Sequence, residues 1–84
     1  MGTKNNPGAF DCYKSALPDE PMFVLLARDR AFEKIVRAWT VERQYSIFNG
    51  DAPETDSAMI EEALECAFAG ARWRRDNNGI WRAK

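Results

Sequence analysis

The chain has 84 residues, of which 45% are hydrophobic and 30% are charged, and its net charge is -1. This composition is typical of one folded domain, although a domain of this size buries only about 60% of the surface that its unfolded chain exposes. The charge argues against the uniformly basic surface that non-specific binding of duplex nucleic acid requires. The absence of histidine removes the commonest general acid and base at neutral pH.

Residues 1–9 are polar and contain the turn signal Pro7-Gly8, so we expect a flexible N-terminal arm followed by a single helical domain over residues 10–84. Asp11 is predicted to cap a short helix that Pro18 ends, because the residue before a proline avoids the helical region. Phe10, Tyr13 and Leu17 are the expected apolar anchors of this helix.

An apolar run over residues 22–27 follows Asp19, Glu20 and Pro21. A proline directly after acidic residues is a good helix start, and this predicts a short buried helix over about residues 21–28. A buried strand is the alternative, because the run has no clear period. The helix is favoured, since the chain offers no second strand of matching character for pairing.

The pattern D-E-P-x-F-V-L-x-x-x-D at residues 19–29, followed by V-R-x-W at residues 36–39, resembles small uncharacterised proteins of alphaproteobacteria and their phages. The resemblance covers only the middle part of the chain. It implies a protein of phage or prophage type and brings no known activity.

Asp29 is predicted to cap a long helix over about residues 30–48, which Asn49-Gly50 closes. The helical period places one set of side chains on a buried face: Phe32, Ile35, Val36, Trp39, Arg43, Ser46 and Ile47. It places a second set in water: Glu33, Lys34, Arg37, Thr40, Glu42 and Gln44.

A second long helix is predicted over about residues 53–75 and starts at Asp51-Ala52-Pro53-Glu54 or, alternatively, at Asp56-Ser57. Its small residues are expected to let a neighbouring helix approach closely: Ala63, Ala67, Gly70 and Ala71. The predicted fold is therefore all-α, with two longer antiparallel helices (about 30–48 and 53–75) braced by one or two short N-terminal helices.

The C-terminal region is the strongest candidate for ligand or partner binding, through Arg72, Arg74, Arg75, Trp81 and Arg82. Residues 71–84 hold five cations and one acid, whereas residues 51–65 hold six acids and no cation. Arginine beside tryptophan can stack on bases and bind phosphate with two hydrogen bonds. The alternative is a solvated helix end, in which the cations complement the helix dipole without a ligand. Trp73 is expected in the core.

Two further surfaces are candidates. Arg28, Arg30 and Arg37 form a secondary cationic set, for which ordinary salt bridges are the alternative explanation. Tyr45, Ile47 and Phe48 are candidate oligomer contacts, because two helices and a brace do not need so much apolar surface.

Cys12 and Cys66 are 54 positions apart, which is no metal-ligand spacing, so we expect no metal and no cofactor. A disulfide between them is the alternative to two free, mostly buried thiols, which a reducing compartment favours. The longest apolar run is too short for the roughly 20 residues that span a bilayer. No apolar leader with a cleavage site precedes the domain, so we expect the reducing cytoplasm of a bacterial host.

These observations favour a small, non-enzymatic binding protein of phage or prophage type that forms a homo-oligomer and inhibits or adapts a host protein through surface contacts. One alternative is an oligomer that sequesters a small anionic ligand, such as a signalling or cyclic nucleotide. Another is a small nucleic-acid-binding regulator, although the acids that open the second long helix would repel the phosphates of a duplex.

Overall fold

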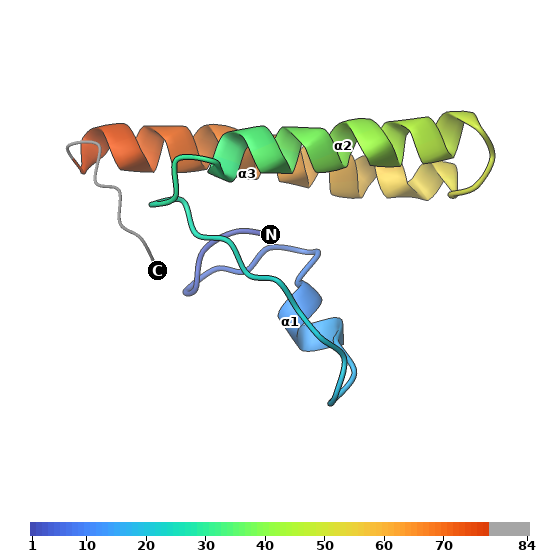
Figure 1. Ribbon diagram of the computed structural model, residues 1–84, viewed down its shortest axis with the longest axis horizontal. Coiled ribbons are helices and arrows are strands. Elements are labelled where there is room, and N and C mark those ends of the chain that lie inside the picture. Colours follow the sequence, from blue (N-terminus) through green and yellow to red (C-terminus); the bar gives the residue numbers. More distant parts are fainter. Residues whose placement is uncertain (78–84) are drawn as a thin grey trace.

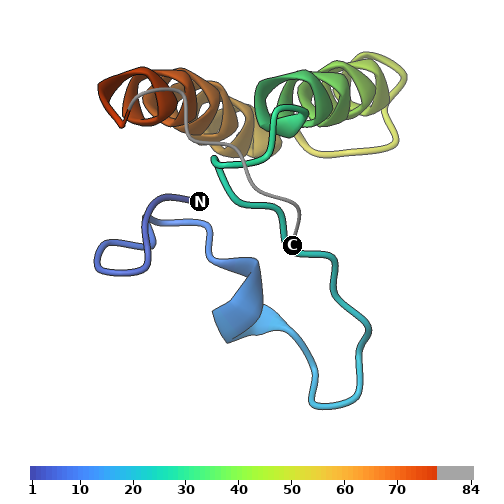
Figure 2. The ribbon, with the colours of Figure 1, turned by 60° about the vertical axis from the view of Figure 1, so that its left-hand side comes forward.

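The computed structural model describes residues 1–77. Helix α1 spans Cys12–Ser15, α2 spans Phe32–Phe48, the 3-10 turn η1 spans Glu54–Asp56, and α3 spans Ser57–Asp76. Helices α2 and α3 lie side by side as an antiparallel hairpin, and residues 1–31, here called the N-terminal segment, lie on one side of the pair (Figures 1 and 2). The predicted all-α class with two long packed helices is confirmed.

The ends of α2 follow from local hydrogen bonding. Before the helix, the Asp29 carboxylate accepts the Ala31 amide at 2.8 Å and the Asp29 carbonyl accepts the Phe32 amide at 3.1 Å, so Asp29 closes the turn that leads into α2. After the helix, Gly50 has φ +81°, a left-handed conformation that costs a glycine no Cβ clash. Both predicted ends lie within two residues of the observed ones.

Helix α3 begins at the later of the two predicted starts. Pro53 precedes η1, and the Ser57 hydroxyl donates to the Glu54 carbonyl at 2.6 Å where η1 passes into α3. Arg43 of α2 pairs with Asp56 at 3.3 Å, which ties this turn to the first long helix.

The core is a thin seam between α2 and α3, and its apolar members are Phe32, Ile60, Ala63 and Ala67. Gly70 is also buried there, and a Cβ at this position would lie 2.5 Å from Cε2 of Phe32. Because carbon atoms do not approach so closely, Gly70 is what allows the Phe32 ring to reach α3. The predicted close approach over small residues of α3 is confirmed at Ala63, Ala67 and Gly70.

The predicted faces of α2 are wrong at three positions. Glu33, expected in water, is half-buried because its carboxylate pairs with Arg74. Thr40, expected in water, is only 6% exposed, because its hydroxyl donates to the Arg37 carbonyl at 2.6 Å and the side chain therefore carries no unsatisfied polar atom into the seam. Ile35, expected in the core, is 43% exposed, because the thin seam does not reach it.

The predicted buried helix over residues 21–28 is wrong, and the alternative strand is wrong too. Residues 21–26 have no regular secondary structure, and Met22, Phe23, Val24 and Leu26 are exposed. A helix this short is marginal without tertiary packing, and of this run only Leu25 and Ala27 are half-buried.

The first ten residues of the N-terminal segment are held to α3 by one side chain. The Glu62 carboxylate accepts hydrogen bonds from the amides of Ala9 (2.8 Å) and Phe10 (3.0 Å) and from the Met1 ammonium (2.9 Å). Helix α1 has the predicted cap, since Asp11 accepts the Tyr13 amide, but α1 packs on neither long helix. Tyr13 and Leu17 are 75% and 70% exposed, so they are not the expected anchors.

Candidate functional site

The most prominent feature of the N-terminal segment is its exposed apolar surface. Six side chains, here called the N-terminal apolar surface, are between 43% and 77% exposed: Tyr13, Leu17, Met22, Phe23, Val24 and Leu26. Several exposed apolar side chains in one segment of a small protein are typical of a contact site for another molecule.

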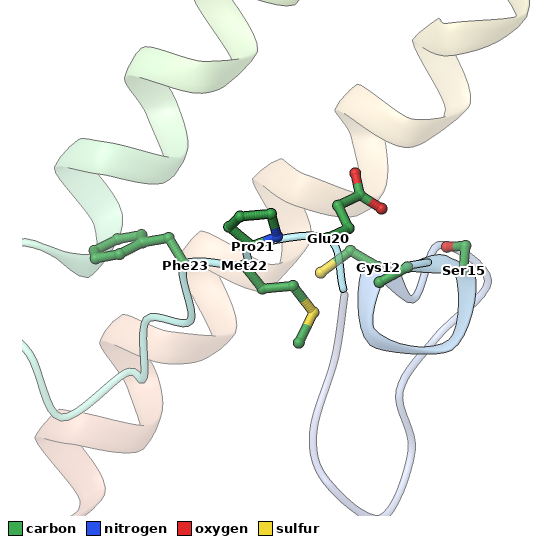
Figure 3. Close-up of a pocket in the computed structure, with 7 residues that line it drawn as sticks. Cys12, Ser15, Glu20, Pro21, Met22 and Phe23 are labelled. Atoms are coloured by element: carbon green, nitrogen blue, oxygen red, sulfur yellow. The ribbon is translucent and has the colours of Figure 1, made fainter. Parts of the chain in front are cut away.

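A shallow open cavity of about 330 Å³ lies within this surface. Its lining side chains come from α1 on one side and from residues 20–23 on the other (Figure 3), namely Cys12, Ser15, Ala16, Glu20, Pro21, Met22 and Phe23. Glu20 also accepts the Leu17 amide at 3.0 Å, which closes the turn between these two walls. A second cavity of about 250 Å³ shares Ala16, Glu20 and Met22 with it. Both cavities thus combine apolar and polar groups with the Glu20 carboxylate, and neither is lined by a lysine or an arginine.

A second apolar surface follows the outer side of α2. Ala38, Val41, Tyr45 and Phe48, here called the α2 stripe, are spaced three, four and three residues apart and are all exposed, Val41, Tyr45 and Phe48 by 60%, 65% and 85%. This spacing places them on one side of the helix, opposite the side that holds buried Phe32 and Thr40. Helix α2 is therefore apolar on two opposite sides.

The predicted oligomer contacts divide between these two sides of α2. Tyr45 and Phe48 belong to the exposed α2 stripe. Ile47 is half-buried and lies seven residues from Thr40, which places it on the side that faces α3.

Arg74, one of the candidate ligand residues, is engaged within the molecule. Its guanidinium donates two hydrogen bonds to the Glu33 carboxylate, at 2.7 Å and 2.5 Å, and further ones to the carbonyls of Ala27 (2.9 Å) and Asp29 (3.2 Å). The pair is largely buried, with the two side chains 18% and 22% exposed. A ligand would have to displace these bonds, so Arg74 serves to join the C-terminal end of α3 to the entry of α2.

The ionisation of this pair reflects the contact. The Arg74 guanidinium, by hydrogen bonding and charge, lowers the pKa of Glu33 below its ordinary value of 4.5, and the same contact raises the pKa of Arg74. Each partner therefore stabilises the charged form of the other.

The remaining C-terminal candidates do not gather around Arg74. Arg72 is exposed. Arg75, the residue after Arg74, is also exposed and pairs with its neighbour Asp76 at 3.7 Å. Trp73 is 45% exposed, so its predicted place in the core is wrong. Trp81 and Arg82 lie outside the described residues. The arrangement of Arg72 and Arg75 matches a solvated helix end with basic residues in its last turn.

The secondary cationic candidates are exposed. Arg28 and Arg30 lie in the turn before α2, and Arg37 lies on α2 with its guanidinium 5.5 Å from the ring centre of Phe68 on α3. A cation over an aromatic ring at this distance is a weak attractive contact between the two helices.

The two cysteines differ in environment. Cys12 is exposed, so the expectation that both thiols are mostly buried is wrong for it, whereas Cys66 is half-buried. Burial raises the pKa of the Cys66 thiol, which keeps it protonated at neutral pH.

Over residues 1–77, no group of three His, Cys, Asp or Glu side chains is placed to hold a metal ion. No helix in this range has the length and apolarity needed to cross a membrane.

Several residues of these surfaces were not predicted as site residues. The α2 stripe could have been found from the three-four-three spacing of Ala38, Val41, Tyr45 and Phe48. The N-terminal apolar surface could not, because its residues were assigned to a buried helix. Glu62, which holds the N-terminal segment, gives no signal in the sequence beyond being one of several acids on its helix.

Comparisons of this chain with protein-family models, with curated proteins and with solved structures give no match. Its function is therefore inferred from its own geometry.

Proposed function

We propose that the chain is a small, non-enzymatic binding protein that inhibits or adapts a larger host protein through surface contacts. The observation that carries this proposal is the apolar surface that the described residues, 1–77, leave exposed on two separate elements, the N-terminal segment and α2. Exposed apolar side chains in this number are typical of contact sites for another protein, and a standard protein interface hides about 800 Å² on each partner.

The nature of this surface supports the same proposal. Twelve large hydrophobic side chains among residues 1–77 are at least 43% exposed, whereas the buried hydrophobic side chains are only Phe32, Ile60, Ala63 and Ala67. A core this small gives little stability, because hydrophobic burial contributes only about 25 cal/mol per Å² of apolar area. Binding that covers the exposed side chains would stabilise the folded chain by mass action.

The N-terminal apolar surface is the proposed contact for the host protein. It combines exposed Tyr13, Leu17 and Met22 with a cavity that carries the Glu20 carboxylate. A fitting partner would present an apolar ridge with a basic residue beside it, since apolar area supplies affinity and a charge pair supplies orientation. The phage or prophage setting of this proposal comes from the resemblance of residues 19–39 alone.

A homo-oligomer is the second part of the proposal. The N-terminal apolar surface and the α2 stripe lie on different elements, so one can bind a host protein while the other binds a second copy of the chain.

Sequestration of a small anionic ligand is less well supported. Arg74, its central candidate, is bound to Glu33, and Arg75 pairs in solvent with Asp76. The carboxylate in the cavities of the N-terminal apolar surface would repel an anion.

The test is capture of a partner from host extract by the full chain and by matched variants. The wild type should retain one host protein at stoichiometric amount. The double variant Leu17→Asp, Met22→Asp should lose it, because two charges would enter the apolar contact. Phe68→Asp, which puts one such charge at a side chain 53% exposed on α3, is the control and should retain the host protein. Equal capture by all three proteins, or a small anion released by salt in place of a protein, would contradict the proposal.

A further inference from the structure

The α2 stripe has the form of a helix-pairing surface. Ala38, Val41, Tyr45 and Phe48 alternate steps of three and four residues, which is the spacing of the seam between two helices in a coiled coil. The stripe faces away from α3, so a second helix laid along it would not meet the rest of the hairpin. Its length of eleven residues corresponds to about three helical turns.

We propose that two copies of the chain form a dimer in which their α2 stripes pair in antiparallel orientation. This inference deepens the homo-oligomer part of the proposed function and does not depend on the identity of a host protein. The paired seam would be isologous, with a two-fold axis that crosses it near residue 43, between Val41 and Tyr45.

Side-chain size favours the antiparallel orientation. About this axis the smallest member, Ala38, faces the partner copy's most exposed aromatic member, Phe48, and Val41 faces Tyr45. Small-against-large layers fill the space between two helices evenly. A parallel pair would instead set Ala38 against Ala38 at one end of the seam, which leaves a gap, and crowd two Phe48 rings together at the other end.

Charge favours the same orientation. Lys34 continues the stripe toward the N-terminal end of α2, with Arg37 beside it, and Asp51 follows the C-terminal end. An antiparallel pair brings these cations to the partner copy's Asp51 and to its carbonyl-rich helix end, where positive charge is stabilising. A parallel pair would place two Lys34 ammonium groups together in the seam. The antiparallel register brings Glu42 near Glu42 of the second copy. Removal of this charge is therefore expected to strengthen the dimer.

The first experiment is sedimentation equilibrium of the purified full chain over a wide concentration range. The wild type should approach twice its mass of 9.6 kDa. Tyr45→Glu should weaken the dimer by about 100-fold or more, because it would bury unpaired charge at the centre of the seam. Tyr13→Glu, the same change at a side chain 75% exposed on α1, should leave the dimer intact.

Two further variants test the seam and the register. Phe48→Glu places the same charge at the end of the stripe, on a side chain that is 85% exposed. Circular dichroism of each variant checks that the helices are kept. Glu42→Gln should tighten the dimer by about two- to fivefold, because it removes a like-charge contact. In a parallel pair it would weaken the dimer, since Glu42 would there lie beside Arg37 of the second copy.

Spin labels on Lys34→Cys, in a Cys12→Ser and Cys66→Ala background, report the orientation directly. The antiparallel dimer predicts labels about 27 Å apart along the helices, because each residue 34 lies nine residues from the axis at 1.5 Å per residue. Labels side by side, a wild type that stays monomeric, or a folded Tyr45→Glu chain that still dimerises would overturn the proposal. None of these results would affect host-protein capture through the N-terminal apolar surface, so the two proposals fail separately.

Discussion

The helical hairpin and the N-terminal segment are held together by different kinds of interaction. The hairpin consists of two long helices that satisfy their own backbone hydrogen bonds and share a thin buried seam around Phe32 and Gly70. The N-terminal segment has one short helix and is fastened by side chains of α3, namely Glu62 at residues 1–10 and Arg74 at residues 27–29.

This difference has a consequence for stability and for binding. A segment fastened by a few polar contacts can keep a defined backbone without burying its own apolar side chains. Those side chains then remain available to another molecule. The hairpin is the scaffold, and the N-terminal segment is the part that we expect to gain order and stability on binding.

The largest expected effect comes from filling the space that Gly70 leaves in the hairpin. Gly70→Val should lower the free energy of unfolding by about 2–3 kcal/mol, because its side chain would overlap the Phe32 ring. Denaturant unfolding measures the change. Ala69→Val, at the exposed neighbouring position, should cost only about 0.5 kcal/mol of helix propensity. Equal losses in the two variants would show that the seam is not tightly packed at Gly70.

The next effect comes from Arg74, which joins the two regions. Arg74→Met should lower the free energy of unfolding by about 1–3 kcal/mol, since it leaves the half-buried Glu33 carboxylate without its charged donor. Arg75→Met is the matched control at an exposed pair and should change the stability by no more than about 0.5 kcal/mol. Denaturant unfolding of both variants decides whether Arg74 is a structural residue. Similar stabilities would return Arg74 to the set of candidate ligand residues.

The contribution of this ion pair should depend on pH. The pKa of Glu33 is lower in the folded chain than its ordinary value of 4.5, so the pair stabilises the fold fully above about pH 4.5 and loses its effect as the pH falls through the lower, folded pKa. The wild type should therefore be more stable than Glu33→Gln at pH 7, and the difference should shrink in acid. A difference that grows as the pH falls would contradict the assigned direction of the shift.

The smallest and most local effect is expected at Glu62. Glu62→Gln removes the charge that the Met1 ammonium and the amides of Ala9 and Phe10 contact. Hydrogen exchange at Ala9 and Phe10 should become faster, while exchange in the α2–α3 seam stays unchanged. Glu65→Gln, at an exposed position of the same helix, should alter neither region. Faster exchange throughout the hairpin would mean that the two regions unfold together.

The sequence predicted the hairpin well because its signals are local. Caps and turns such as Asp29, Gly50 and Ser57 act within a few residues, and the small residues of α3 point to a close neighbour wherever that neighbour comes from. Residues 22–27 do not follow their local pattern. An apolar run predicts burial, but burial depends on which elements lie nearby, and here Met22, Phe23, Val24 and Leu26 are exposed while Leu25 and Ala27 are half-buried.

The candidate site was predicted only in part for a related reason. Tyr45 and Phe48 were selected as surplus apolar residues and are exposed on the α2 stripe. Arg74 was selected for its charge, yet its partner Glu33 lies 41 residues earlier in the chain, so no local pattern reveals their pairing. Contacts across long sequence separations decide which charged residues remain available to a ligand.

Native mass spectrometry of the untagged protein, purified gently from host lysate, most directly tests whether the excess apolar surface is a binding surface. We predict a dimer of about twice 9.6 kDa that carries a host protein and loses it in the Leu17→Asp, Met22→Asp variant. A bare monomer, or a chain carrying an added mass of a few hundred daltons that high salt removes, would contradict this prediction. The second of these results would favour sequestration of a small anionic ligand.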